Sequence, residues 1–228
     1  MHRLILCALI AGAFAPVPAG AQQAPTASEQ AAYRGVFAAA ASGDAARLRD
    51  LLDDGAAVDE RDANRRTPLH VAAFGGRHAA MRELVGRGAD PNALDGDRYD
   101  IVTIAAVADD RPTLDVALAL GCRSGNVTSR YDGTALIAAA HLGHAEVVRT
   151  LVHAGAPLDH VNNLGWTALI EAIVLGNGGP RHVATVQALL VGGADVRIAD
   201  RAGRTPLALA TERGYAPMQA LLRAAGAR

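Results

Sequence analysis

The segment of residues 67–92 constrains the fold more than any other part of the chain, because its pattern defines two short helices. Thr67 is placed to cap a helix that begins with a proline, at a position where the missing N–H costs nothing. The apolar residues that follow fall on one helical face, and Gly75-Gly76 ends that helix. A second apolar stripe around Leu84 predicts another helix, which Gly88 ends in a left-handed conformation. A pair this small cannot bury its apolar face alone, so it must stack on copies of itself.

Copies of this pattern recur along the chain. Counted from Thr67, equivalent helix starts follow at intervals of 33, 34, 33 and 38 residues, at Asp100, Thr134, Thr167 and Thr205, and stepping back 33 residues reaches Arg34. A helix-ending glycine follows each of five starts by 21 residues, at Gly55, Gly88, Gly121, Gly155 and Gly226. Gly193 comes five residues late, which accounts for the one long interval. We therefore count six repeats over residues 34–228.

The run Thr67-Pro68-Leu69-His70-Val71-Ala72 matches the T-P-L-H-x-A signature in full, so the chain resembles the ankyrin repeat family. The resemblance implies an all-α solenoid of about six helix–turn–helix repeats with short β-hairpin fingers formed by the linkers. The linkers favour tight turns, because an Asp or Asn lies five residues before four of the repeat starts (Asp62, Asp95, Asn162 and Asp200). The third repeat departs most from the pattern, with Asp100-Ile101 at its start and Asp109-Asp110 in place of a glycine break.

Residues 1–21 read as a secretory signal peptide. A minimal basic start precedes an apolar run over residues 4–15, and Ala19-Gly20-Ala21 supplies the small residues needed before cleavage at Gln22. The apolar run is too short to span a bilayer comfortably, so an uncleaved membrane anchor is the alternative interpretation. We expect an exported protein, located in the periplasm if the host is a Gram-negative bacterium, with no membrane span after cleavage. Residues 22–33 are polar and rich in Ala and Gln, which predicts a flexible lead-in before the repeat domain of residues 34–228.

Charge and cysteine content restrict the possible partners. The formal net charge of −1 gives no electrostatic case for nucleic acid. Removing the leader leaves one cysteine, Cys122, in a slot that other repeats fill with alanine, so we interpret it as a small packed residue without a disulfide. We expect the mature protein to be a monomer.

Ankyrin domains are recognition scaffolds, and the resemblance implies binding of another protein through the finger tips and the concave face. Arg and aromatic residues occupy these positions although aromatic residues make up only 4% of the chain, and these are the types enriched at binding hot spots. The candidate binding residues are Arg66, Phe74, Tyr99, Arg130, Tyr131, His141, Asn163, Trp166 and Arg204. Each could instead pack within the stack; Trp166, for example, could lean over a neighbouring finger.

Histidines in repeats four and five suggest a competing function, a metal-binding or small-molecule-binding protein of the periplasm. A zinc site needs three or four converging ligands; His141 and His144 are not on one helical face, and His70 and His144 are already explained by the repeat pattern. We therefore predict no metal site, and no residues suggest a cofactor. The acidic run around Asp95-Gly96-Asp97 lacks the closing Glu of a calcium loop.

The sequence contains no motif for catalysis, such as a nucleophile elbow, a phosphate-binding glycine loop or a paired metalloprotease histidine motif. Glu171 lies on a first helix where other repeats have apolar residues, but a single carboxylate without a paired acid or base makes no enzyme. A salt bridge or a partly exposed edge explains it more simply. We therefore expect a binding protein, with an uncharacterised enzyme as a third hypothesis.

Overall fold

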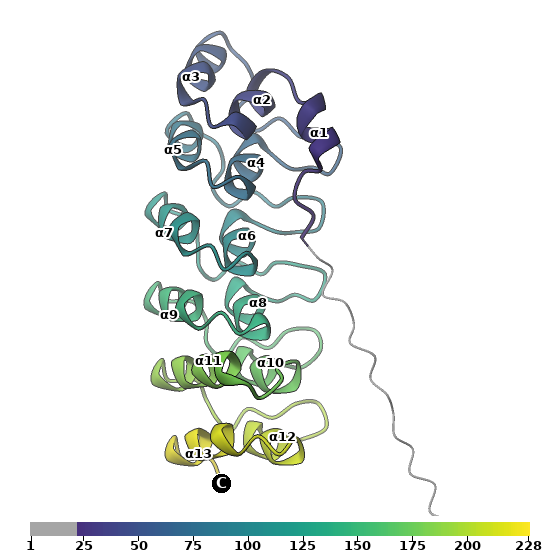
Figure 1. Ribbon diagram of the computed structural model, residues 1–228, viewed down its shortest axis with the longest axis vertical. Coiled ribbons are helices and arrows are strands. Elements are labelled where there is room, and N and C mark those ends of the chain that lie inside the picture. Colours follow the sequence, from purple (N-terminus) through teal and green to yellow (C-terminus); the bar gives the residue numbers. More distant parts are fainter. Residues whose placement is uncertain (1–21) are drawn as a thin grey trace, which may run out of the picture.

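The computed structural model describes residues 22–228, in which helix pairs stack in register into an elongated solenoid (Figure 1). The expected signal peptide, residues 1–21, lies outside the described residues. A short helix, α1 (Ala27–Ala32), precedes six pairs. The pairs are α2 (Gly35–Ser42) with α3 (Ala45–Asp53), α4 (Pro68–Phe74) with α5 (His78–Gly86), α6 (Ile101–Val107) with α7 (Arg111–Ala119), α8 (Ala135–Leu142) with α9 (Ala145–His153), α10 (Ala168–Val174) with α11 (Pro180–Val191), and α12 (Pro206–Glu212) with α13 (Ala216–Ala224). The six predicted repeats are therefore confirmed.

Side-chain caps set the starts of the first helices from α4 onward, whereas α2 begins at Arg34 without one. The Thr67 hydroxyl accepts a hydrogen bond from the His70 backbone N–H, and Thr134, Thr167 and Thr205 cap α8, α10 and α12 in the same way. Asp100 caps α6 with its carboxylate, so this departure of the third repeat keeps the helix start. Asp110 likewise caps α7. Asp109, where other repeats have glycine, adopts a φ of 57°, a left-handed conformation that is uncommon for a residue with a side chain.

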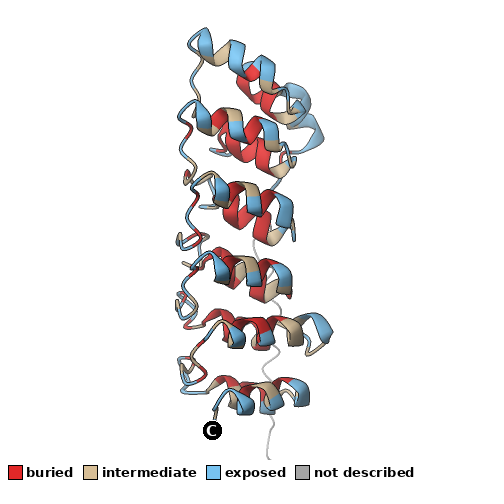
Figure 2. Cartoon of the chain, turned by 90° about the vertical axis from the view of Figure 1, so that its left-hand side faces the viewer, coloured by how far each residue is buried: buried red, intermediate tan, exposed pale blue. Residues whose placement is uncertain are grey.

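The core runs the length of the stack between the two rows of helices. Figure 2 shows buried residues on the inward faces of the helices and exposed residues at their outer ends and turns. The first helices are buried nearly all round because they pack against their neighbours in the stack as well as their own second helices, and alanine lets them approach closely. The second helices contribute one buried stripe each, represented by Leu48, Leu84, Leu114, Leu151, Leu189 and Leu222.

The linkers form finger-like turns rather than strand ladders. In the finger of residues 62–66, the Asp62 N–H donates to the Arg66 carbonyl at 3.0 Å, and the Asp62 carboxylate accepts from the N–H groups of Asn64 and Arg66. The same arrangement recurs in the fingers of residues 95–99, 162–166 and 200–204. Because side chains take these N–H groups, a regular ladder does not form. Within residues 22–228 the only β-bridge is Thr128 with Gly133, in the finger of residues 128–133.

The segment expected to be a flexible lead-in, residues 22–33, contains helix α1. Thr26 and Glu29 form a reciprocal capping box that starts α1. The Tyr33 ring stacks on Phe37 with centroids 5.0 Å apart, and its hydroxyl donates to Asp62 at 2.8 Å. Alanine-rich composition alone predicted little order, whereas the capping box and these contacts with the first two repeats define a helix. Within residues 22–228, no helix is both long enough and apolar enough to cross a membrane.

Candidate protein-binding surface

The candidate surface consists of the five fingers (residues 62–66, 95–99, 128–133, 162–166 and 200–204) and the adjoining first helices. The fingers project to one side of the stack, away from the second helices (Figure 1). We call this side the finger face. The candidate binding residues predicted from the sequence were expected on this side.

Consecutive fingers are joined by backbone hydrogen bonds. Gly96 N–H donates to the Asn64 carbonyl at 2.9 Å, Ser129 N–H to that of Arg98 at 3.0 Å, and Asn163 N–H to that of Tyr131 at 2.9 Å. A Cβ at Gly96 would lie 2.8 Å from the Asn64 oxygen, so the close approach there requires glycine. Four of the five fingers are thus linked in one continuous row, which holds their side chains in fixed relative positions.

Ion pairs and side-chain contacts reinforce the same row. Arg98 pairs with Asp132 at 3.1 Å, and Arg130 pairs with Asp97 at 3.6 Å in the opposite direction. The Asn163 side chain donates to the Arg130 carbonyl at 2.9 Å. These exposed pairs add little stability individually, but they restrict the finger-tip side chains before any partner binds.

The structure places most of the predicted residues on this surface. Arg130, Asn163 and Arg204 are exposed, and Tyr131 and His141 are half-buried. The remaining aromatic residues, Phe74, Tyr99 and Trp166, are half-buried and pack partly against the core. These three therefore support the stack and offer a partner only part of their surface.

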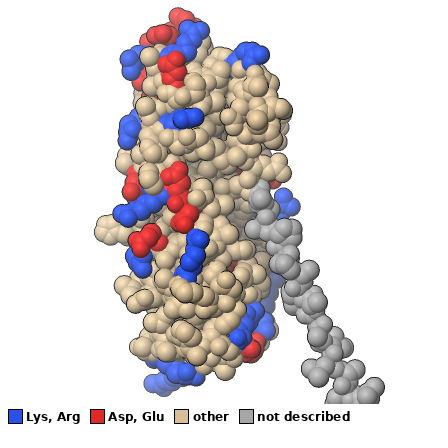
Figure 3. All heavy atoms as spheres, in the orientation of Figure 1, with Lys and Arg blue, Asp and Glu red and all other residues tan. Residues whose placement is uncertain are grey.

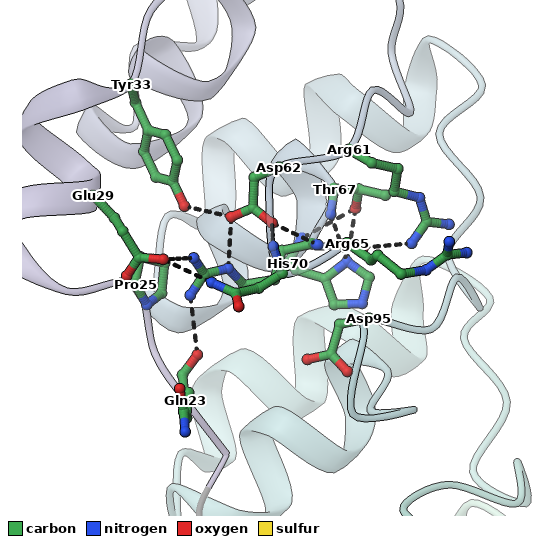
Figure 4. Close-up of polar contacts among 12 residues, drawn as sticks. Gln23, Pro25, Glu29, Tyr33, Arg61, Asp62, Arg65, Thr67, His70 and Asp95 are labelled. Atoms are coloured by element: carbon green, nitrogen blue, oxygen red, sulfur yellow. Dashed lines mark hydrogen bonds and ion pairs between the residues drawn. The ribbon is translucent and has the colours of Figure 1, made fainter.

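Arg66 is the exception among the predicted residues. It is 1% exposed, so its guanidinium is not available to a partner. Its Nε pairs with Asp62 at 2.7 Å and its Nη2 with Glu29 at 2.5 Å, while Nη1 donates to the Gln23 carbonyl at 3.1 Å (Figure 4). The hydrogen bonds with Thr26 in the capping box lower the pKa of Glu29 to about 2, and the Arg66 guanidinium adds to this effect. Arg66 is a structural residue that fastens α1 to the first finger.

Exposed apolar residues also gather on the finger face. Five large hydrophobic residues are exposed in the described chain, and three of them, Val127, Val161 and Leu164, lie in or beside two consecutive fingers. Leu175 ends α10 nearby in sequence, while Val191 lies on the second helix α11. None of these five residues was among the binding residues predicted from the sequence. A signal was available for Leu175, because it is an apolar residue at a turn position that Gly75 fills in the second repeat.

Glu171 is buried, with 4% of its surface exposed, and each of its carboxylate oxygens has a polar partner. One oxygen accepts from the Asn162 side chain at 2.8 Å, and the other lies 3.2 Å from His141 Nδ1. These contacts join α10 to its own finger and to α8. Of the two explanations expected for Glu171, a salt bridge or a partly exposed edge, its burial excludes the exposed edge, and the Glu171 carboxylate has His141 and Asn162 as polar partners.

Most of the other histidines connect neighbouring repeats rather than converge. His144, His160 and His182 each lie within 2.9 Å of a backbone carbonyl in the preceding repeat. His70 spans from the Thr67 N–H to the Tyr99 carbonyl. Within residues 22–228, no group of three His, Cys, Asp or Glu side chains is arranged to hold a metal ion.

Charged side chains of both signs are interspersed on the face shown in Figure 3, without a continuous basic stripe. An open hollow of about 360 Å³ lies at the helix turns of repeats three to five. Asp109 and Arg181, which pair at 3.1 Å, and His144 contribute to its lining. None of the finger residues line this hollow, so it belongs to a different part of the surface.

Comparison with known proteins agrees with the fold. The pattern of three ankyrin repeats matches residues 102–179, and that of a single ankyrin repeat matches residues 64–96. The ankyrin repeat protein YahD of Escherichia coli (strain K12) is 35% identical over 190 residues, covering 83% of this chain and 94% of YahD. The mouse B-cell lymphoma 3 protein homolog is 34% identical over 176 residues, which cover only 38% of that protein.

Solved structures give the same result. An ankyrin repeat domain from Acinetobacter baumannii AYE has a TM-score of 0.77 at 41% identity, covering 85% of this chain and 98% of that domain. The ankyrin repeat domain of Bcl-3 has a TM-score of 0.76 at 29% identity, covering 86% of this chain and 87% of that one. Such domains are typically non-enzymatic scaffolds for protein–protein interaction. The chain belongs to the ankyrin repeat family.

Proposed function

We propose that the chain is an exported ankyrin scaffold that binds another protein through its finger face. The observation that carries this proposal is the coincidence, on two consecutive fingers, of exposed apolar side chains with a backbone-linked row. Val127, Val161 and Leu164 are exposed there beside Tyr131. Exposed apolar residues that cluster on a rigid element favour a binding surface over random exposure.

The linked fingers reduce the ordering cost of binding. The Asn163–Tyr131 and Asn163–Arg130 hydrogen bonds fix the two central fingers relative to each other. A partner that docks there would not have to order these loops, so more of the contact energy would contribute to affinity. The central footprint of the proposed interface is Tyr131, Asn163 and Leu164, with Arg130 and Arg204 at its rim.

Partner capture with two matched variants tests this footprint. The double variant Tyr131→Ala/Leu164→Ser removes two finger side chains, and Val191→Ser removes an apolar side chain that is 85% exposed on α11. We expect a protein captured from periplasmic extract by the wild type to be lost with the finger variant and retained with Val191→Ser. Equal recovery by all three chains, each shown to be folded by circular dichroism, would exclude the finger face.

Export is the second part of the proposal, and it is supported by the apolar run and small-residue cleavage segment of residues 1–21. Intact-mass measurement of chain recovered from the periplasmic fraction tests it. The mass of a chain that begins at Gln22 supports cleavage, whereas full-length chain in the membrane fraction supports the anchored alternative. We also propose that the exported chain is a monomer, as expected from the sequence, and light scattering of the purified protein tests this.

A further inference from the structure

The proposed cleavage would make Gln22 the first residue of the exported chain. In the structure, the Gln22 side-chain nitrogen Nε2 is buried and has no hydrogen-bond partner among the described residues. The only other buried side-chain atom of this kind in residues 22–228 is an oxygen of Asp59. Buried polar groups are normally paired, so an unpaired amide nitrogen at this position calls for an explanation.

The chain that follows Gln22 is held firmly in the fold. The Gln23 carbonyl accepts from Arg66, and the buried Pro25 accepts at its carbonyl from the Gln30 side chain at 2.8 Å. Figure 4 shows Gln23 and Pro25 beside Glu29, next to the first finger. After cleavage, the chain would therefore begin at Gln22, one residue before the carbonyl that Arg66 holds by a hydrogen bond.

We propose that Gln22 of the exported chain is converted to pyroglutamate. This inference rests on the proposed cleavage after Ala21. The freed α-nitrogen attacks the side-chain carbonyl carbon Cδ, so a bond forms between the backbone nitrogen and Cδ. The bond between Cδ and Nε2 breaks, and Nε2 leaves as ammonia with a proton from the α-nitrogen. The product is a lactam ring of the backbone nitrogen, Cα, Cβ, Cγ and Cδ, and the step needs no oxidant or reductant.

The modification removes the atom that the fold leaves unpaired. Nε2 departs, while the side-chain oxygen remains as the lactam carbonyl. The α-ammonium charge is removed as well, and the adjoining network is complete without it. Both oxygens of Asp62 accept hydrogen bonds, and so do both oxygens of Glu29.

Intact mass of the full chain, expressed with its leader and purified from the periplasm, tests the proposal. We expect the mass of residues 22–228 less one ammonia. Gln22→Asn is a matched variant, because it keeps a side-chain amide but is one methylene too short to close the same ring. It should lose the leader and retain the ammonia. Gln23→Ala, which leaves the backbone carbonyl in place, should still lose one ammonia.

Stepwise chemical sequencing from the N-terminus is a second test of the modification. Wild-type chain should give no sequence, because a lactam nitrogen is blocked, and Gln22→Asn should give Asn-Gln-Ala-Pro. A mass of residues 22–228 with the ammonia retained would overturn the modification and leave export standing. Full-length chain, or a start at another residue, would overturn the modification together with the proposed cleavage site.

Discussion

Arg66 and Glu29 form an ion pair of 2.5 Å that joins the first finger to helix α1. The Arg66 side chain is 2% exposed as a result. Arg66 also pairs with Asp62, four positions earlier in the finger, at 2.7 Å. Arg204 occupies the same position in the last finger and pairs in the same way with Asp200, also at 2.7 Å. Its side chain is 44% exposed, since no helix covers it. The two arginines thus differ mainly in burial.

We predict that Arg66→Ala destabilises the protein by about 3–5 kcal/mol, the usual cost of removing one partner from a buried charged network. Asp62 would keep its backbone partners but lose the guanidinium, and Glu29 would keep only the Asn64 side chain as its link to the finger. Chemical denaturation followed by circular dichroism measures the change in free energy of unfolding.

Arg204→Ala is the control for that experiment. It removes an arginine that is 44% exposed from a carboxylate, Asp200, that is buried but keeps two backbone N–H donors, so the expected loss is smaller, about 1–2 kcal/mol. Equal losses for the two variants would show that α1 does not bury Arg66 in solution, and would restore the flexible lead-in that the composition favoured.

We predict that stability falls as the pH decreases from 6.5 to about 4 because of His70. Burial lowers the pKa of His70 from 6.5 to about 4. Its Nδ1 accepts from the Thr67 N–H at 3.1 Å, which a doubly protonated ring could not do. In this interval the unfolded chain binds a proton that the folded chain does not, so the free energy of unfolding declines by about 1.4 kcal/mol per pH unit, or about 3 kcal/mol in total.

His70→Gln provides the comparison for the pH series. The variant should be less stable than the wild type at pH 7.5, because a buried hydrogen-bonding ring is lost. Its free energy of unfolding should decline less steeply between pH 6.5 and 4.5. The lowered pKa values of Asp62 and Asp200 act at lower pH, since those carboxylates lose their favourable contacts only as they become protonated. Parallel pH profiles for wild type and variant would exclude His70 as the cause.

Repeat spacing predicted the helices well because the signals are local. Five of the six first helices begin at a side-chain cap, α2 being the exception, and each second helix ends near a glycine in the left-handed conformation. The departures at Asp100 and Asp110 were interpreted as irregular, yet both are caps. A carboxylate can replace a threonine hydroxyl at that position, which a strict signature does not reveal.

The binding surface was predictable only in outline. Position in the repeat identified the fingers, but it could not distinguish Arg66 from Arg204. Arg66 is buried because helix α1 lies against it, whereas α1 is far from Arg204. That helix arises from a capping box at Thr26 and contacts made by Tyr33. The links between fingers were also missed, since the Asn163–Tyr131 hydrogen bond joins residues from different repeats.

We predict that the Cys122 thiol does not react in the folded protein. It is 6% exposed, and burial raises its pKa to about 12, so almost no thiolate forms near neutral pH. A chromogenic disulfide reagent at pH 8 should report no fast-reacting thiol until denaturant is added, and then one thiol per mature chain. Rapid labelling of native protein would show that the third repeat opens, and would contradict the packed role assigned to Cys122.

A paired substitution on α11 tests the register of the fifth repeat, which contains the long turn. Leu189 is completely buried, while Val191, two residues further along the same helix, is 85% exposed. Leu189→Ala should cost about 2–5 kcal/mol, because it removes buried methyl groups and leaves a cavity. Val191→Ala should change the free energy of unfolding by less than about 0.5 kcal/mol, as expected for a surface position. Thermal and urea denaturation of the two variants measures both values. Because α11 packs on α9 and α13, similar losses at the two positions would mean that the helix is rotated about its axis relative to this arrangement.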